Sequence, residues 1–246
     1  MKLQPTILGI CLAALLGACG GSGGDAAPTA PPAVVGPSFP LKSAYSALTA
    51  TAFTKSFAVS GTCSGTASFA KAAAVAGAVF QSTAGLSEAS SLTLVLNGCT
   101  IRTSSSLSYV YYDASYTPVG ITYPGSYAAY LAPASIPASV VVGDVGTIGT
   151  ANSYQDFTKS VALGKDVLSY IVEGDSASTA DAATAIVNLV TKHFDATNVL
   201  TSTTQVRYRI GANGALTLIS IDIEGASGAR NSFIFLNSFA YHLILQ

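Results

Sequence analysis

The stretch Gln205–Asp222 reads QVRYRIGANGALTLISID, and it decides the fold that the sequence predicts. Asn213 and Gly214 stand between two runs that alternate apolar and polar residues, which is the strongest short-range signal for a β-hairpin. A two-residue turn would pair Ala212 with Ala215. The resulting apolar face pairs Val206 with Ile221, Tyr208 with Ile219 and Ile210 with Thr217. The polar face pairs Gln205 with Asp222, Arg207 with Ser220 and Arg209 with Leu218.

The segment before this hairpin extends the sheet by a third strand. Ala185–Phe194 is rich in Thr, Ile and Val, which favour strands, and turn-forming residues follow it at 195–198. If Phe194 pairs with Val199, Val187 lies opposite Val206 on the apolar face, and the three strands form a C-terminal β-meander. A helix that begins near Asp181 is the alternative reading.

Strand candidates occupy most of the remaining chain. They are Lys55–Thr62, Ser91–Asn97, Ser153–Thr158, Val167–Glu173 and Arg230–Phe235, together with strands and turns within Ser106–Tyr130. Leu41–Phe53 has the spacing of a short helix, Phe69–Phe80 is ambiguous, and the glycines within 143–149 are read as turns in an extended loop. The predicted fold class is therefore all-β, an antiparallel sandwich or partial barrel with a C-terminal β-meander and one short helix near the start.

Composition excludes two broad classes of protein. The chain has 246 residues, of which 50% are hydrophobic and only 9% are charged, with a formal net charge of −1. A nucleic-acid binder needs a basic surface to neutralise phosphates, so we expect no nucleic-acid partner. Intrinsic disorder goes with low hydrophobicity and high net charge, which is the opposite of this composition.

The first residues, MKLQPTILGICLAALLGAC, have the pattern of an export signal. Lys2 precedes an apolar run over 7–16, which is too short for a membrane-spanning helix of about 20 residues but suits a signal peptide. Leu16-Gly17-Ala18-Cys19 then resembles a bacterial lipobox. The resemblance implies that Cys19 is lipidated and that the chain is cleaved before it. The alternative is an ordinary signal peptide cut near Ala26 or Ala27.

The lipobox also sets the expected organisation and location. Residues 1–18 form the signal peptide, 19–40 a lipidated flexible Gly/Pro tether, 41–131 a disulfide-stapled β unit and 132–246 a β-meander unit. The two β units are alternatively one continuous domain, since only the connector at 132–138 separates them. Gly20 stands where the best-known sorting systems use Asp for inner-membrane retention. The resemblance therefore implies the bacterial cell envelope, at the outer membrane.

Two cysteines remain in the mature chain besides the lipidated one. Cys63 and Cys99 each follow a predicted strand, and in an oxidising compartment we expect a disulfide between them. A metal or redox pair is the competing interpretation. The sequence has no CxxC motif, and neither cysteine has a neighbouring histidine, so the disulfide is favoured.

Residues that could carry catalysis are few. His193 has the parity of Val187 and Leu189 near a strand end, and His242 stands among the last residues. Gly174-Asp175-Ser176 resembles the start of a GDS-type esterase block, but no Asp-x-x-His accompanies it. Carboxylate pairs occur at Asp222/Glu224 and Glu173/Asp175, with calcium or glycoside chemistry as an alternative to simple exposure. We therefore expect no catalysis, no metal and no cofactor, and a hydrolase using Ser176 or a carboxylate pair is the alternative.

Two groups of side chains are candidates for a binding surface. One is a tyrosine-rich run, represented by Tyr109, Tyr111 and Tyr112, whose rings could contact glycans or proteins. The other is the polar face of the meander, with Lys192, Gln205, Arg207, Arg209, Asp222 and Glu224. Structural packing and a solvated outer face are the respective alternatives.

The chain as a whole resembles a loose group of uncharacterised bacterial envelope lipoproteins. The shared features are the lipobox, the Gly/Pro tether, a GTCSGT-like segment at Gly61–Thr66 and the hairpin at Tyr208–Asp222. The resemblance implies membrane attachment through the N-terminal lipid and no particular activity. We expect a structural or binding role, with an envelope protein or a glycan as partner.

Overall fold

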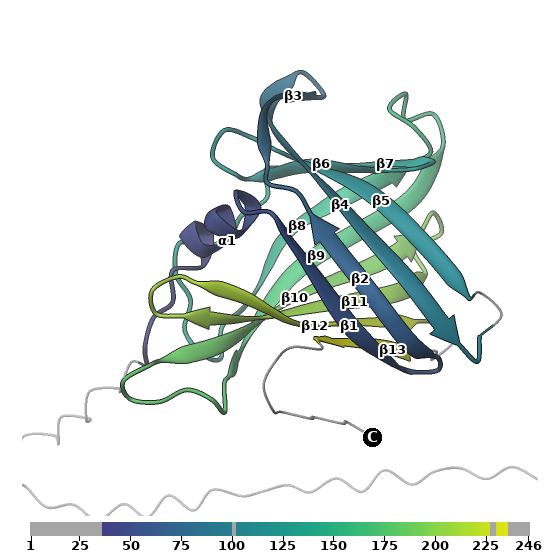
Figure 1. Ribbon diagram of the computed structural model, residues 1–246. Coiled ribbons are helices and arrows are strands. Elements are labelled where there is room, and N and C mark those ends of the chain that lie inside the picture. Colours follow the sequence, from purple (N-terminus) through teal and green to yellow (C-terminus); the bar gives the residue numbers. More distant parts are fainter. Residues whose placement is uncertain (1–35, 100–101, 227–229, 236–246) are drawn as a thin grey trace, which may run out of the picture. The chain divides into compact units, whose positions relative to one another are not determined.

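The computed structural model describes residues 36–99, 102–226 and 230–235, which form one helix and thirteen strands (Figure 1). The elements are α1 (Leu41–Thr49), β1 (Phe53–Gly61), β2 (Ser64–Lys71), β3 (Val75–Phe80), β4 (Thr83–Asn97), β5 (Thr103–Tyr112), β6 (Pro118–Tyr123), β7 (Ser126–Tyr130), β8 (Val145–Tyr154), β9 (Ala162–Gly174), β10 (Thr184–Asp195), β11 (Leu200–Gly211), β12 (Leu216–Gly225) and β13 (Arg230–Phe235). The prediction of an all-β fold with one short helix near the start is confirmed.

All thirteen strands belong to one antiparallel sheet. Their order is β2-β1-β13-β12-β11-β10-β9-β8-β7-β6-β5-β4-β3, and β2 also pairs with β4 from Ser64↔Asn97 to Lys71↔Ser90. The sheet therefore curls until its two ends meet, while β3 pairs with the first residues of β4 outside that contact. The architecture corresponds to the barrel-like alternative of the prediction rather than to two stacked sheets.

The two predicted β units are one continuous sheet, as the alternative in the sequence analysis allowed. β7 pairs with β8 and β1 pairs with β13, so strands from both predicted units are neighbours at two places. The described residues from Gly36 onward accordingly form one compact unit. The end of the predicted tether also belongs to it, because Phe39 is fully buried and exchanges backbone hydrogen bonds of 2.8 and 2.9 Å with Val140.

The C-terminal hairpin has a three-residue loop instead of the predicted two-residue turn. The N–H of Gly211 donates to the carbonyl of Ala215 at 3.0 Å, and Gly214 has φ +79°, a left-handed conformation that glycine adopts without strain. The register consequently begins with Ile210↔Leu216 and continues with Tyr208↔Leu218. The apolar face thus carries Leu216 and Leu218, and the predicted places of Thr217 and Ile219 on that face are wrong.

A β-bulge restores the predicted register farther along this hairpin. The pairing shifts between Arg207 and Tyr208, so that Ile219 is the extra residue on β12. Beyond it, Val206↔Ile221, Gln205↔Asp222 and Arg207↔Ser220 pair as predicted. The one-residue error of the turn and the one-residue bulge cancel because each changes the register by one.

The third strand of the meander is confirmed, with a corrected register. β10 pairs Val187 with Tyr208 and Leu189 with Val206, two residues away from the predicted pairing of Val187 with Val206. One residue of this shift comes from the turn, which pairs Phe194 with Leu200 instead of Val199, and the other comes from a bulge between His193 and Phe194. A shift of two residues keeps every side chain on its predicted face.

One strand lies in a different place from its prediction. β8 spans Val145–Tyr154, whereas the sequence indicated Ser153–Thr158, and Gly146 and Gly149 lie inside the strand rather than in a loop. A Cβ at Gly146 would lie 2.7 Å from the ring of Tyr170, and one at Gly149 would lie 2.8 Å from the ring of Tyr130. These two glycines therefore make room for tyrosine rings on β9 and β7, the two strands that neighbour β8.

The register gives the sheet two distinct faces. We call inner the face that carries Phe57, Val187 and Ile210, and outer the opposite one. The inner face holds two apolar clusters, one of which includes Leu41 and Ala44 of α1. Helix α1 lies at one end of the sheet, which we call the helix end (Figure 1).

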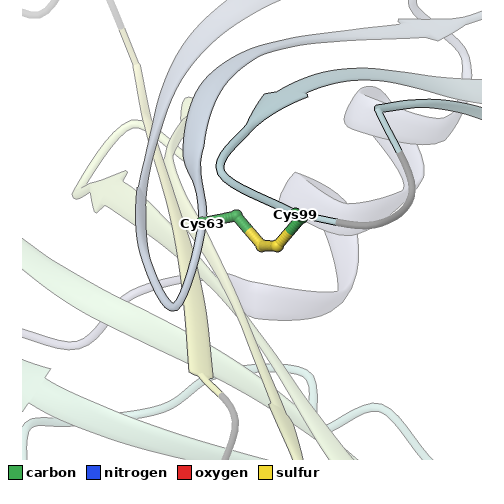
Figure 2. The surroundings of a disulfide bond; sticks show 2 residues. All are labelled: Cys63 and Cys99. Atoms are coloured by element: carbon green, nitrogen blue, oxygen red, sulfur yellow. A yellow bond between two sulfur atoms is a disulfide. The ribbon is translucent and has the colours of Figure 1, made fainter.

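The other end of the sheet carries the disulfide, and we call it the disulfide end. Cys63, in the β1–β2 turn, is bonded to Cys99, just after β4, with the Cα atoms 5.8 Å apart (Figure 2). The predicted pairing of these two cysteines is confirmed. The bridge joins the turn and the loop at one place on this rim, since β2 and β4 are already neighbours there.

Candidate binding site on the inner face

A row of polar side chains crosses four strands on the inner face near the disulfide end. Asp166 on β9 is directly opposite His193 on β10, and Nδ1 of His193 lies 2.7 Å from Oδ1 of Asp166. Ser153 on β8 donates to Oδ2 of Asp166 at 3.3 Å, and Nε2 of His193 lies 3.3 Å from Oγ1 of Thr204 on β11. The row Ser153–Asp166–His193–Thr204 is therefore one hydrogen-bonded chain.

Solvent reaches this part of the inner face. The side chains of His193 and Asp166 are 31% and 22% exposed, and Tyr123, which shares the face, is 41% exposed. The inner-face residues Ser104 and Ser106 are also exposed, whereas the inner face at the helix end is buried. Hydroxyl groups dominate the accessible part, and the register places these on it: Ser104, Ser106, Tyr123, Tyr130, Ser153, Ser202 and Thr204.

Two tyrosines of this group are held in the protonated form. Although 41% of Tyr123 is exposed, the partial loss of hydration raises its pKa to about 12, and the negative charge of Asp166 contributes in the same direction. Burial and the charge of Asp166 likewise raise the pKa of Tyr130 to about 12. Both phenols can therefore donate hydrogen bonds across the neutral pH range.

The order of Asp166, His193 and Thr204 is that of an acid, an imidazole and a hydroxyl, as in nucleophilic catalysis. Acyl transfer also needs N–H donors for the developing oxyanion. The backbone of β9, β10 and β11 is paired on both sides in the sheet, so its amides near this row are engaged except where the bulge beside His193 interrupts the ladder. The arrangement therefore fits hydrogen bonding to a ligand better than acyl transfer.

A second polar cluster on the inner face has a structural role at the helix end. Nζ of Lys71 lies 2.9 Å from Oε2 of Glu88, and both side chains are only 7% exposed. The same ammonium donates to the carbonyls of Leu48, Thr49 and Thr51 at 3.0, 3.1 and 3.0 Å. It thus satisfies carbonyls at the C-terminal end of α1, which have no partners within the helix, and ties the helix to the sheet.

The environment of Glu88 is dry enough to change its ionisation. Burial raises the pKa of Glu88 from its ordinary value of 4.5, against the opposing effects of Lys71 and of Tyr112, whose hydroxyl donates to Oε2 at 3.4 Å. Burial also raises the pKa of Tyr112. Tyr112 is a predicted binding residue that is 3% exposed, so it serves this buried cluster instead of an accessible surface.

The charged residues of the predicted meander surface lie on the outer face and neutralise one another. Arg207 is paired with Asp222, and Oε1 of Gln205 accepts from Arg207 at 3.2 Å and from Asn188 at 2.9 Å. Asn188 is only 1% exposed. A second pair joins Arg209 to Asp175, whereas Lys192 on the same face is exposed.

The tyrosines of the predicted surface are divided between packing and exposure. Tyr109 and Tyr111 lie on the outer face of β5, where Tyr109 is 41% exposed. Phe80 lies with its ring centre 4.9 Å from those of both Tyr111 and Tyr127. Because Phe80 belongs to β3, the ring of Tyr111 packs β3 against the sheet. Five strands separate β5 from β11, so these tyrosines and the arginines do not form one surface.

Ser176 and His193 are far apart. Gly174, two residues before Ser176, pairs with Ala185, whereas His193 pairs with Asp166 eight residues away along β9. Eight residues of strand span about 26 Å at about 3.3 Å per residue. His242, the other histidine considered, lies outside the described residues.

The carboxylates considered for calcium or glycoside chemistry are dispersed or paired. Asp222 is bonded to Arg207 and Asp175 to Arg209. Among the described residues, no group of three or more His, Cys, Asp or Glu side chains could hold a metal ion.

Sequence reasoning placed His193 on the correct face but missed its partner. The strand predicted at Val167–Glu173 begins one residue too late to include Asp166. Extending the alternation of Leu168, Tyr170 and Val172 backwards by two residues puts a carboxylate on an otherwise apolar face. The charged Asp166 in line with these apolar residues was the sequence signal that could have revealed this site.

Cys19, the predicted lipidation residue, lies outside the described residues. In the part of the chain that the structure describes, no helix has the length and apolar character needed to cross a membrane. Comparison with protein-family models, with curated proteins and with solved structures finds no match to this chain.

Proposed function

We propose that this chain is a bacterial envelope lipoprotein, anchored at the outer membrane through lipid on Cys19, whose β unit binds a ligand and performs no catalysis. The anchoring half rests on Leu16-Gly17-Ala18-Cys19 after a short apolar run. One acyl chain binds a membrane only marginally, whereas the two or three chains of a bacterial lipoprotein anchor it stably. The Cys63–Cys99 disulfide supports export, because structural disulfides persist in oxidising compartments.

The observation that carries the binding half is the solvent-reached row Ser153–Asp166–His193–Thr204 on the inner face. A few convergent polar groups that solvent reaches are a usual feature of a ligand site. The separation of Ser176 from His193 and the pairing of Asp175 and Asp222 with arginines count against the hydrolase alternative.

The start of the described unit and the polar row lie at opposite ends of the sheet. The described unit begins at Gly36, and Phe39 packs at the helix end beside Val140. The polar row lies toward the opposite, disulfide end. We propose that the disulfide end is the one that is open to ligands.

Cys19→Ala is the direct test of the anchor. We expect the variant in the soluble fraction and without incorporated palmitate, because the acceptor thiol is lost. Cys11→Ala is the matched control, since Cys11 lies in the segment that cleavage discards, and it should remain in the membrane fraction. Retention of Cys19→Ala in membranes would contradict the lipid anchor.

A further inference from the structure

Asp166 has unused hydrogen-bonding capacity that faces solvent. A carboxylate offers about four lone-pair sites, two on each oxygen. In the structure, Oδ1 is bonded to His193 and Oδ2 accepts from Ser153, which uses one site on each oxygen. One site on each oxygen therefore remains, on a side chain that is 22% exposed.

The groups around Asp166 and His193 are rich in hydroxyls. Ser202 is directly opposite His193, Thr204 contacts Nε2 of His193, and Tyr123 and Tyr130 lie close enough to Asp166 for its charge to raise their pKa values. A hydroxyl both donates and accepts, so this lining suits a ligand that does the same. The rings of the two tyrosines add apolar faces beside the polar groups.

The charge of the site limits the ligand further. The inner-face positions of β8–β11 hold no lysine or arginine, because Lys165, Lys192, Arg207 and Arg209 all have outer-face parity. An anionic ligand would meet the carboxylate of Asp166 without a permanent cation to offset the repulsion. The chemistry of the lining therefore favours an uncharged ligand with adjacent hydroxyl groups.

We infer that this site binds a neutral sugar, with two neighbouring hydroxyls of the sugar donating to the two oxygens of Asp166. Ser202, Thr204 and the phenol of Tyr123 supply further hydrogen bonds, and a tyrosine ring takes an apolar face of the sugar. This inference rests on the proposed binding function and names its ligand class. The sugar can be free or part of an envelope polysaccharide, because both present the same vicinal diols.

The test uses the full chain, purified in detergent, with neutral sugars as probes. Methyl glucoside, methyl galactoside, methyl mannoside and lactose cover different diol configurations, and sialyllactose is the anionic counterpart of lactose. We expect binding of at least one neutral sugar by saturation-transfer NMR and calorimetry, with sialyllactose weaker than lactose. An isolated envelope polysaccharide, compared with its constituent sugars, separates a polymeric from a free ligand.

Variants assign the binding to Asp166. Asp166→Asn should weaken it about tenfold or more, because a charge-assisted acceptor is lost. Ser202→Val should weaken it as well, whereas Thr203→Val, the adjacent residue with its side chain on the outer face, should leave the affinity unchanged. Tyr123→Phe keeps the ring and removes the hydroxyl, so it tests the site without opening a cavity. Thermal unfolding of each variant shows that it is folded.

Two results would overturn this inference. One is the absence of binding for every neutral sugar at millimolar concentration, and the other is binding that Asp166→Asn and Tyr123→Phe leave unchanged. Either result leaves the lipoprotein proposal intact if Cys19→Ala is released from the membrane. Retention of that variant would contradict the anchor without affecting the sugar measurements.

Discussion

Lys71→Met should destabilise the protein strongly, although it keeps the length and apolar stem of the side chain. The ammonium lies 2.9 Å from Glu88 in a place where both side chains are 7% exposed. Removing one partner of a buried ion pair costs about 3–5 kcal/mol, because the other charge stays buried without compensation. The carbonyls of Leu48, Thr49 and Thr51 lose this donor as well, although those of Leu48 and Thr49 each keep a backbone N–H donor. We therefore expect the free energy of unfolding to fall by about 3–5 kcal/mol.

The measurement is guanidinium unfolding of the full chain, followed by far-ultraviolet circular dichroism because the chain contains no tryptophan. Lys42→Met is the matched control, since Lys42 lies on α1, the helix that Lys71 caps, and is exposed. It should change stability by no more than about 0.5 kcal/mol. A loss below about 1 kcal/mol for Lys71→Met, or one equal to that of the control, would refute the role assigned to Lys71.

The stability loss of Lys71→Met should also depend on pH, in a direction that follows from the pKa of Glu88. Burial raises the pKa of Glu88 in the folded state, so the folded protein binds this proton more tightly than the unfolded chain does. The contribution of Glu88 to stability is therefore largest below its ordinary pKa of 4.5 and is lost as the pH rises through the raised value. Without Lys71 the pKa should rise further. The deficit of Lys71→Met should consequently grow with pH over this range.

Three further predictions concern other parts of the fold. Cys63→Ser should lower stability by about 4 kcal/mol, the chain-entropy value for a loop of about 37 residues, as measured by denaturant unfolding without reductant. Gly120→Ala should destabilise the protein and alter near-ultraviolet dichroism, because its Cβ would lie 2.0 Å from the ring of Phe80, whereas Gly174→Ala meets nothing within 4 Å and should be tolerated. Burial disfavours ionisation of Asp175, but hydrogen bonds from an arginine, a threonine and a backbone amide outweigh it and lower its pKa. Its contribution to stability should be present above pH 3.8 and lost as the pH falls through the lowered value, and Asp175→Asn should remove that part of the acid transition.

The strands of the meander could be predicted because their residues alternate. Val187 and Val206 fall on the apolar face in both the prediction and the structure, since a shift of two residues preserves the face. The three-residue loop at Gly214 could not be distinguished from a two-residue turn, because Asn-Gly suits both geometries. The bulge at Ile219 depends on packing between strands, for which a single segment gives no signal.

The candidate site was predictable only in part for a similar reason. His193 could be placed by parity from its own strand, whereas its contact with Asp166 requires the pairing of β9 with β10. The tyrosine group and the polar face of the meander lie on separate parts of the sheet, because five strands separate β5 from β11. Sequence proximity gave no indication of this separation.

The sequence by itself determined the elements that depend on local chemistry. Alternation determined the strands of the meander, the spacing of apolar residues determined the helix, and two cysteines after predicted strands determined the disulfide. The tertiary structure alone decided the non-local contacts, including the pairing of β1 with β13, the pairing of β2 with β4 and the capping of α1 by Lys71. These contacts join residues far apart in the chain, and their free energy depends on burial that exists only after the sheet has curled. The polar row around Asp166 belongs to this second group, because its members lie on four different strands and meet only when those strands pair.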